Sequence, residues 1–173
     1  MMKTCFKLCA LGAIAAGYGA LLMALPFSPV TLLLSVPVCV LLSGLAHELG
    51  HLLAYRLLKL TWVRLSLSLW VLEKGKGLRL DGSRPLFSGS CTCAYDPSLP
   101  LRRYSLALVS GGITTLLLGA AALACAAVSG GSLASFLLCF GIVAVLGGIY
   151  NLLPFSADRK LLRQIKQESE HTA

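Results

Sequence analysis

The residues with the clearest chemical potential lie in one short run, Ala46-His47-Glu48-Leu49-Gly50-His51, which has the pattern H-E-x-x-H and contains two of the chain's three histidines. If this run is helical, His47 and His51 share a face, so both imidazoles can bind one Zn²⁺. Glu48 then lies one step round the helix, beside the metal and not on it, where its carboxylate can hold a water molecule. The run therefore predicts a zinc site with Glu48 beside the metal.

Such a short pattern also arises by chance, and the alternative is a helix end whose polar side chains are solvated. The surroundings favour the metal site, because the stretch from Leu8 to Ala46 that precedes it contains no charged residue. Ionisable side chains at the centre of a membrane span cost about 2.5–3.5 kcal/mol each and are a functional hypothesis by default. A position near the membrane interface would lower that cost, which keeps the solvated helix end as the alternative.

A catalytic zinc usually has three protein ligands and one open position for water. The only other acid next to a long apolar stretch is Asp158, which follows the second uncharged stretch, Tyr104 to Ala157. Pro154 lacks a backbone donor and should end the preceding helix. The sequence therefore predicts Asp158 as the third ligand, with a plain acid at the membrane surface as the alternative.

The elements that position these residues follow from the composition, which is 57% hydrophobic and only 13% charged. A membrane helix needs about 20 apolar residues, so each uncharged stretch can hold two spans. Turn-forming residues divide both stretches, at Pro26 to Pro29 and at Ser129 to Ser132. We therefore expect four membrane helices, paired as two hairpins, near residues 8–25, 30–57, 103–128 and 133–155.

The fifteen Lys and Arg residues, which give a net charge of +8, set the expected topology. Two are Lys3 and Lys7, nine lie from Arg56 to Arg103, and four lie in the tail 156–173, and the four helices place all of these parts on one side. Basic residues favour the cytoplasmic side, so both termini should be cytoplasmic. The lipid bilayer is thus the expected partner. A nucleic acid is not, because nucleic-acid binding would require a soluble basic face with aromatic residues among the charges.

The N-terminus also has features of a secretion signal, because Lys3 and Lys7 precede an apolar run. That run, from Leu8 to Leu25, is longer than a usual signal and does not end in an Ala-x-Ala site. We therefore expect the first span to be retained; if it were cleaved, three spans would remain.

The central segment 58–102 is the only sizeable part expected outside the membrane. Apolar and polar residues alternate over 63–72, as in a half-buried strand, and the run from Glu73 to Gly77 reads as a turn. Leu78 to Asp81 alternates again and can return as the partner strand. This predicts a small β-hairpin against the membrane. About 45 residues cannot build a separate core, so residues 1–173 should form one domain.

The seven cysteines carry less information. Cys91-x-Cys93 resembles half of a zinc site, but a structural zinc needs four ligands and no second pair exists. We interpret this pair as free thiols, which stay reduced in the cytoplasm.

Taken together, these motifs resemble those of the site-2 protease family of intramembrane zinc metalloproteases. That family has a helix with H-E-x-x-H, then a membrane-associated β segment, then a later helix that ends in N-x-x-P before a ligand aspartate. This chain has the three features in the same order: Ala46 to His51, the alternating residues 63–72, and Asn151 to Asp158. The similarity covers most of the chain from about residue 40 to 162.

The resemblance implies an all-α polytopic membrane protein with a small β-hairpin between the second and third spans. It implies a zinc metalloendopeptidase that hydrolyses peptide bonds of a membrane-embedded or membrane-associated protein or peptide. Glu48 would be the catalytic residue, and the zinc ligands would be His47, His51 and Asp158. Asn151 and Pro154 would help to hold an extended substrate strand, with a helix-terminating cap as the alternative for that pair.

A peptide bond inside a substrate helix is protected by the hydrogen bonds of that helix, so the substrate must unwind locally. We expect the unwound segment to pair with the strand at 63–72 by β-augmentation.

Three departures from the family's pattern keep other functions open. Arg159 stands where the family has Gly after the aspartate, and the spacing from Asn151 to Asp158 is one residue shorter than usual. In the third span, Gly112 and Thr115 stand in the places of the Pro and Asn of the family's Gly-Pro-x-x-Asn pattern. One alternative is a catalytically silent relative that binds membrane helices. The other is a membrane metal-binding or ion-transport protein, although the stretch 104–157 offers no charged residue for an ion path.

Overall fold

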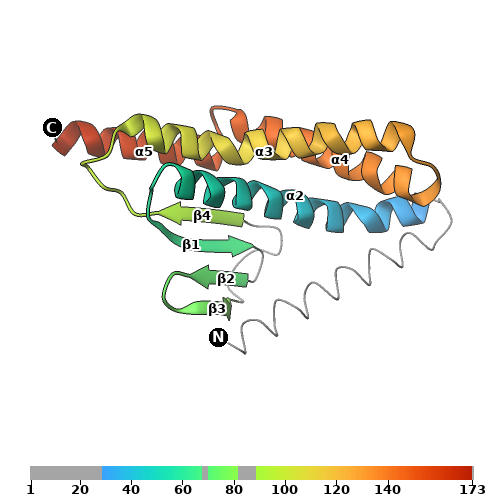
Figure 1. Ribbon diagram of the computed structural model, residues 1–173, viewed down its shortest axis with the longest axis horizontal. Helices are drawn as coiled ribbons and strands as arrows, with labels where there is room; N and C mark the ends of the chain where they lie inside the picture. Colours follow the sequence, from blue (N-terminus) through green and yellow to red (C-terminus); the bar gives the residue numbers. More distant parts are fainter. Residues whose placement is uncertain (1–28, 68–69, 82–88, 173) are drawn as a thin grey trace.

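The computed structural model describes residues 29–67, 70–81 and 89–172 (Figure 1). Three long helices dominate it, and a short fourth helix follows them: α2 (Pro29–Leu57), α3 (Leu101–Val128), α4 (Gly131–Leu152) and α5 (Ala157–Thr172). In this part of the chain, three helical segments are long and apolar enough to cross a membrane. The structure therefore has three of the four expected spans, and the span expected at 8–25 lies outside the described residues. The sequence had not predicted a helix in the tail 156–173, where α5 lies.

The helices α3 and α4 run antiparallel and lie side by side, as expected for a hairpin (Figure 1). Glycines on both helices allow this close approach. A Cβ atom on Gly148 would lie 3.0 Å from the carbonyl oxygen of Gly112, and one on Gly119 would lie 2.9 Å from the backbone nitrogen of Val145. Small residues at helix contacts are typical of membrane bundles, where close packing contributes much of the association energy. The position of α4 against α3 is therefore closely constrained.

A four-stranded antiparallel sheet lies beside α2, in the order β3-β2-β1-β4, where a two-stranded hairpin was expected. Its strands are β1 (Trp62–Leu67), β2 (Trp70–Glu73), β3 (Gly77–Leu80) and β4 (Gly89–Cys93). The expected strand at 63–72 is wrong as one unit, because β1 and β2 fold back on each other and Leu67 pairs with Trp70. Ser68 and Leu69 stand between them in the sequence and are not one of the Gly-containing pairs that signal a two-residue hairpin turn.

The turn expected at Glu73 to Gly77 is confirmed. The Lys76 amide donates to the Glu73 carbonyl at 3.1 Å, and Gly75 and Gly77 have φ of 86° and 78°. Such positive φ values are strained for residues that carry a Cβ. β3 then returns along β2, as the alternation at 78–81 predicted.

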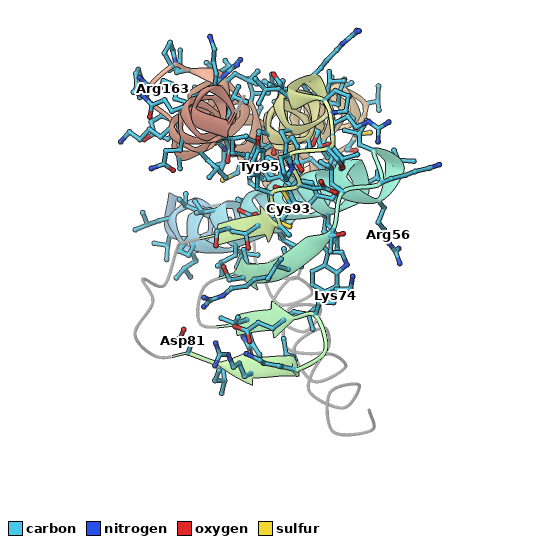
Figure 2. All side chains as sticks on the ribbon, turned by 90° about the vertical axis from the view of Figure 1, so that its left-hand side faces the viewer. Arg56, Lys74, Asp81, Cys93, Tyr95 and Arg163 are labelled. Atoms are coloured by element: carbon cyan, nitrogen blue, oxygen red, sulfur yellow. The ribbon has the colours of Figure 1, made fainter. Side chains whose placement is uncertain are left out.

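The sequence did not indicate β4, whose residues had been assigned to no strand. It pairs with β1 from Trp62–Cys93 to Leu67–Gly89 and packs along α2. Tyr55, Tyr104 and Cys91 belong to the buried cluster that joins α2, α3 and β4, and Ile165 of α5 completes it. Figure 2 looks at this end of the molecule, with Cys93 between the sheet and the helices and with Arg56 and Arg163 pointing outward.

Candidate metal centre

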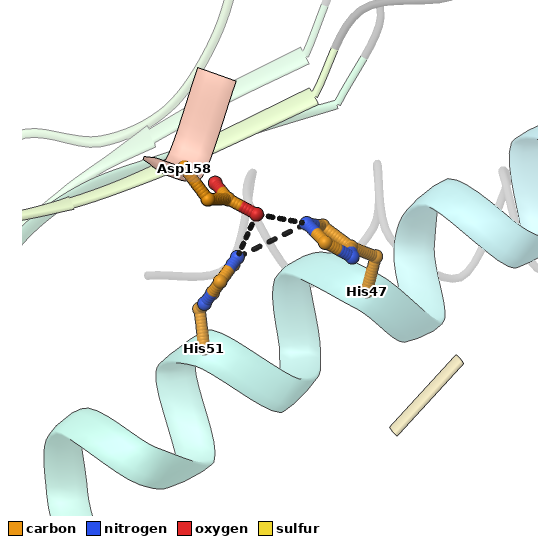
Figure 3. A group of neighbouring side chains, drawn as sticks. All are labelled: His47, His51 and Asp158. Carbon is orange, nitrogen blue, oxygen red and sulfur yellow. Dashed lines mark hydrogen bonds and ion pairs between the residues drawn. The ribbon is translucent and has the colours of Figure 1, made fainter. Parts of the chain in front are cut away.

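The two motif histidines and Asp158 meet in the structure (Figure 3). Asp158 Oδ2 lies 3.2 Å from His47 Nε2 and 3.5 Å from His51 Nε2, and the two Nε2 atoms are 3.0 Å apart. His47 and His51 are buried, and the Asp158 side chain is 19% exposed. These three residues form a group that could hold a metal ion. Their roles as ligands stay a prediction.

The local structure of residues 151–158 explains how Asp158 reaches the histidines. α4 ends at Leu152, two residues before Pro154, as predicted. Ser156 then begins α5: its hydroxyl donates to the Asn151 carbonyl at 2.8 Å and accepts the Arg159 amide at 3.4 Å. Asp158 lies in the first turn of α5, where a negative charge is favoured by the helix dipole. Ser156 was not singled out, although a serine before a polar helical pattern is an N-cap signal.

The hydrogen bond of His51 shows which of its nitrogens faces the group. His51 Nδ1 lies 2.8 Å from the Ala107 carbonyl oxygen, which can only accept. The Nδ1 atom therefore carries a proton, and the Nε2 atom of the neutral ring presents a lone pair to Asp158 and His47. Asp158 Oδ2 is itself buried and, within the described part of the chain, has no partner besides these two histidine nitrogens. Lone pairs that converge in this way repel one another unless a cation or a proton lies between them.

The spacing of the three atoms fits a tetrahedral metal. With ligand distances of about 2.0–2.2 Å, two ligand atoms of a tetrahedral zinc lie about 3.3–3.6 Å apart. The separations here, 3.0, 3.2 and 3.5 Å, agree with that geometry to within a few tenths of an ångström. Two imidazoles and one carboxylate are also a common ligand set of catalytic zinc.

Glu48 lies beside the group, between α2 and β4, and is 4% exposed. A Cβ atom on Gly89 would lie 2.5 Å from Glu48 Oε1, so the first residue of β4 passes directly over the carboxylate. The Tyr55 hydroxyl donates to the Cys91 carbonyl at 3.1 Å and ties β4 to α2 at this point. β4 therefore forms one wall of the site, a role that its sequence did not indicate.

A cavity of about 280 Å³ opens beside the group. Its lining comes from α2, β4, the last turn of α4 and the start of α5, and includes His47, Glu48, Asn151 and Asp158. Cys91 also lines it. Burial, with a smaller effect of Glu48, raises the pKa of the Cys91 thiol to about 12, so the thiol stays neutral. Cys91 and Cys93 form no disulfide.

Helix α3 closes the other side of the histidines. A Cβ atom on Gly111 would lie 2.5 Å from His51 Nε2 and 2.8 Å from His47 Cε1, so only glycine leaves room for both rings. The neighbouring Gly112, which stands in the place of the proline of the family pattern, packs against Leu152 of α4.

The two residues assigned to substrate binding lie in different surroundings. Asn151 lines the cavity, and its Nδ2 atom is 3.2 Å from His47 Nδ1. Pro154 is exposed and does not line the cavity, and its carbonyl accepts a hydrogen bond from Arg163 at 2.8 Å. A substrate contact of either residue stays a prediction.

Fold and site together define a mostly helical chain with helices of membrane-spanning length and a buried His-His-Asp group that could hold a metal ion. Comparisons with protein-family models, with curated proteins and with solved structures found no match to this chain.

Proposed function

We propose that this protein is an intramembrane zinc metalloprotease of the site-2 protease type. The observation that supports this most is the approach of Asp158 to within 3.5 Å of both histidines of the H-E-x-x-H motif. Asp158 is more than 100 residues from the two histidines in the sequence, and Glu48 is buried beside the group. A chance H-E-x-x-H match would not require a distant carboxylate at this position.

In the proposed reaction, His47, His51 and Asp158 would hold Zn²⁺. When bound, the metal supplies Lewis-acid chemistry: it polarises a carbonyl and lowers the pKa of water toward about 7. Glu48 accepts a proton from the attacking water and delivers it to the leaving amine. Because β4 and α3 exclude most solvent around these side chains, the charges that develop during the reaction are screened less than in water.

The sheet limits where an extended substrate could pair. The expectation that the substrate pairs with 63–72 is wrong, because β1 and β2 each already pair on both sides. Among the described strands, β3 and β4 are the edges, and β4 is the one that lines the cavity. We therefore place an unwound substrate segment along β4, where main-chain hydrogen bonds would hold it beside Glu48.

The test combines metal content with cleavage of fluorescently labelled casein by the detergent-purified chain. Wild type should contain about one zinc per chain and cleave casein. Glu48→Gln should retain the zinc, because Glu48 is not a ligand, and should lower the cleavage rate about 10²- to 10⁴-fold, the usual contribution of a general base. Asp96→Asn, the same type of change on a carboxylate outside the cavity, should cleave as wild type does.

Two results would contradict the proposal. No zinc in the wild type would eliminate the metal site, and unchanged cleavage by Glu48→Gln would eliminate the mechanism. Zinc without cleavage in the wild type would favour the catalytically silent alternative.

A further inference from the structure

Asn151 makes a contact that substrate binding does not require. It is the only asparagine in the chain. It lies in the last turn of α4, which packs against α2, the helix that carries the H-E-x-x-H motif. The amide nitrogen Nδ2 of its side chain lies 3.2 Å from Nδ1 of His47, on the side of the ring away from Asp158. The contact joins residues 104 positions apart in the sequence. A side chain placed there acts on the histidine whether or not a substrate is present.

The chemistry of a metal-binding imidazole determines whether His47 Nδ1 donates or accepts a hydrogen bond in this contact. The Nε2 atom of His47 faces Asp158 and His51, so this atom must be free of its proton to bind a metal. The proton then lies on Nδ1 and needs an acceptor. The oxygen and nitrogen of an asparagine amide are nearly indistinguishable in shape, and a half-turn of the amide brings the oxygen to His47. His51 has the same arrangement, with the Ala107 carbonyl as acceptor for its Nδ1 proton.

The backbone holds Asn151 in place for this role. The Ser156 hydroxyl donates to the Asn151 carbonyl at 2.8 Å and fixes the end of α4. One turn earlier, a Cβ atom on Gly148 would lie 2.7 Å from Leu116, so α4 is packed tightly against α3. The amide therefore stays beside His47 without help from a ligand.

We propose that Asn151 is a positioning residue of the metal centre: its amide oxygen accepts the Nδ1 proton of His47 and keeps the Nε2 lone pair directed at the metal. This inference rests on the proposed function, because it requires the His-His-Asp group to bind Zn²⁺. It assigns Asn151 a role in metal affinity, where the family resemblance implied a role in substrate binding. Acceptors of this kind are worth about 10- to 100-fold in metal affinity.

The test measures the Zn²⁺ dissociation constant of the detergent-purified full chain by competition with a chromophoric chelator. Asn151→Leu keeps the approximate shape but removes the acceptor, and it should weaken Zn²⁺ binding about 10- to 100-fold. Asn151→Asp retains an acceptor and has no donor, so it should bind Zn²⁺ at least as tightly as wild type. Tyr150→Phe, at the exposed neighbouring position, should leave the affinity unchanged.

The outcomes separate this inference from the proposed function. If wild type binds Zn²⁺ and Asn151→Leu binds it equally well, Asn151 does not position His47, and the protease proposal stands. If Asn151→Asp is weakened, the amide donates to His47 and the inference is wrong; this variant decides the question even if Asn151→Leu does not fold. Loss of casein cleavage without loss of Zn²⁺ affinity would assign Asn151 to the substrate instead. A wild type that binds no Zn²⁺ would overturn both proposals.

Discussion

The two histidines can share one partner because each ring is contacted at its Nδ1 atom by another helix and directs its Nε2 atom at Asp158. Ala107 and Asn151 contact the Nδ1 atoms, and Gly111 leaves room where any larger residue would meet both rings. The H-E-x-x-H spacing indicated that His47 and His51 share a face. It contained no information about these three contacts, which come from other helices.

Gly111 gives a prediction at the scale of one residue. Gly111→Ala places a methyl group within 2.8 Å of both rings, and the strain of such overpacking is typically about 1–3 kcal/mol. We expect the rings to move and Zn²⁺ affinity to fall about 10-fold or more, as measured by chelator competition. Gly130→Ala is the matched control, because a Cβ atom there would meet no atom within 4 Å. Equal Zn²⁺ affinity of the two variants would contradict the prediction.

At the scale of elements, the break between α4 and α5 brings the carboxylate to the histidines. Pro154 predicted that α4 ends, but it did not predict that a second helix starts at once. The fully buried Ser156 begins α5 and bonds both to the end of α4 and to the first turn of α5. Asp158 is therefore presented by a capped helix and not by a loose tail.

Ser156→Ala tests this interpretation. Loss of an N-cap hydroxyl usually costs about 0.5–2 kcal/mol, and here it also removes the bond to the Asn151 carbonyl. We expect the thermal midpoint to fall and Zn²⁺ binding to weaken, because the start of α5 is held less firmly. Ser129→Ala removes an exposed hydroxyl at the end of α3 and should change neither quantity. Wild-type Zn²⁺ affinity in Ser156→Ala would show that the cap does not position Asp158.

At the scale of the whole molecule, the metal group joins α2 to α5, two elements at opposite ends of the described chain. A metal bound there would link them directly, and binding to the folded state alone raises its stability by mass action. At 100 times the dissociation constant this effect amounts to about 2.7 kcal/mol.

Zinc should therefore raise the thermal unfolding midpoint of the detergent-purified wild type, and a chelator should reverse the rise. His47→Ala removes one ligand and should lose most of the effect. Magnesium, which prefers oxygen ligands in octahedral geometry, serves as the matched control and should stabilise neither protein. An equal rise in wild type and His47→Ala would mean that Zn²⁺ binds elsewhere.

Local patterns in the sequence predicted four helices of spanning length, of which the described residues contain three, and also the helix of the H-E-x-x-H motif and the turn at Glu73 to Gly77. These features depend on residues close in sequence, through apolar length, helical periodicity and turn geometry. The β1–β2 reversal and β4 were missed. No Gly-containing turn pair marks the reversal, and β4 becomes a strand only by pairing with β1.

The sequence by itself determined which residues can carry the chemistry, and it indicated Asp158 because few acids border an apolar stretch. Only the tertiary structure decided what surrounds them: Gly89 over Glu48, Gly111 against both rings and Asn151 behind His47. The physical reason is that side-chain types and spacing act within one element. Contacts between elements depend on how closely whole helices and strands pack, and no local pattern records that distance.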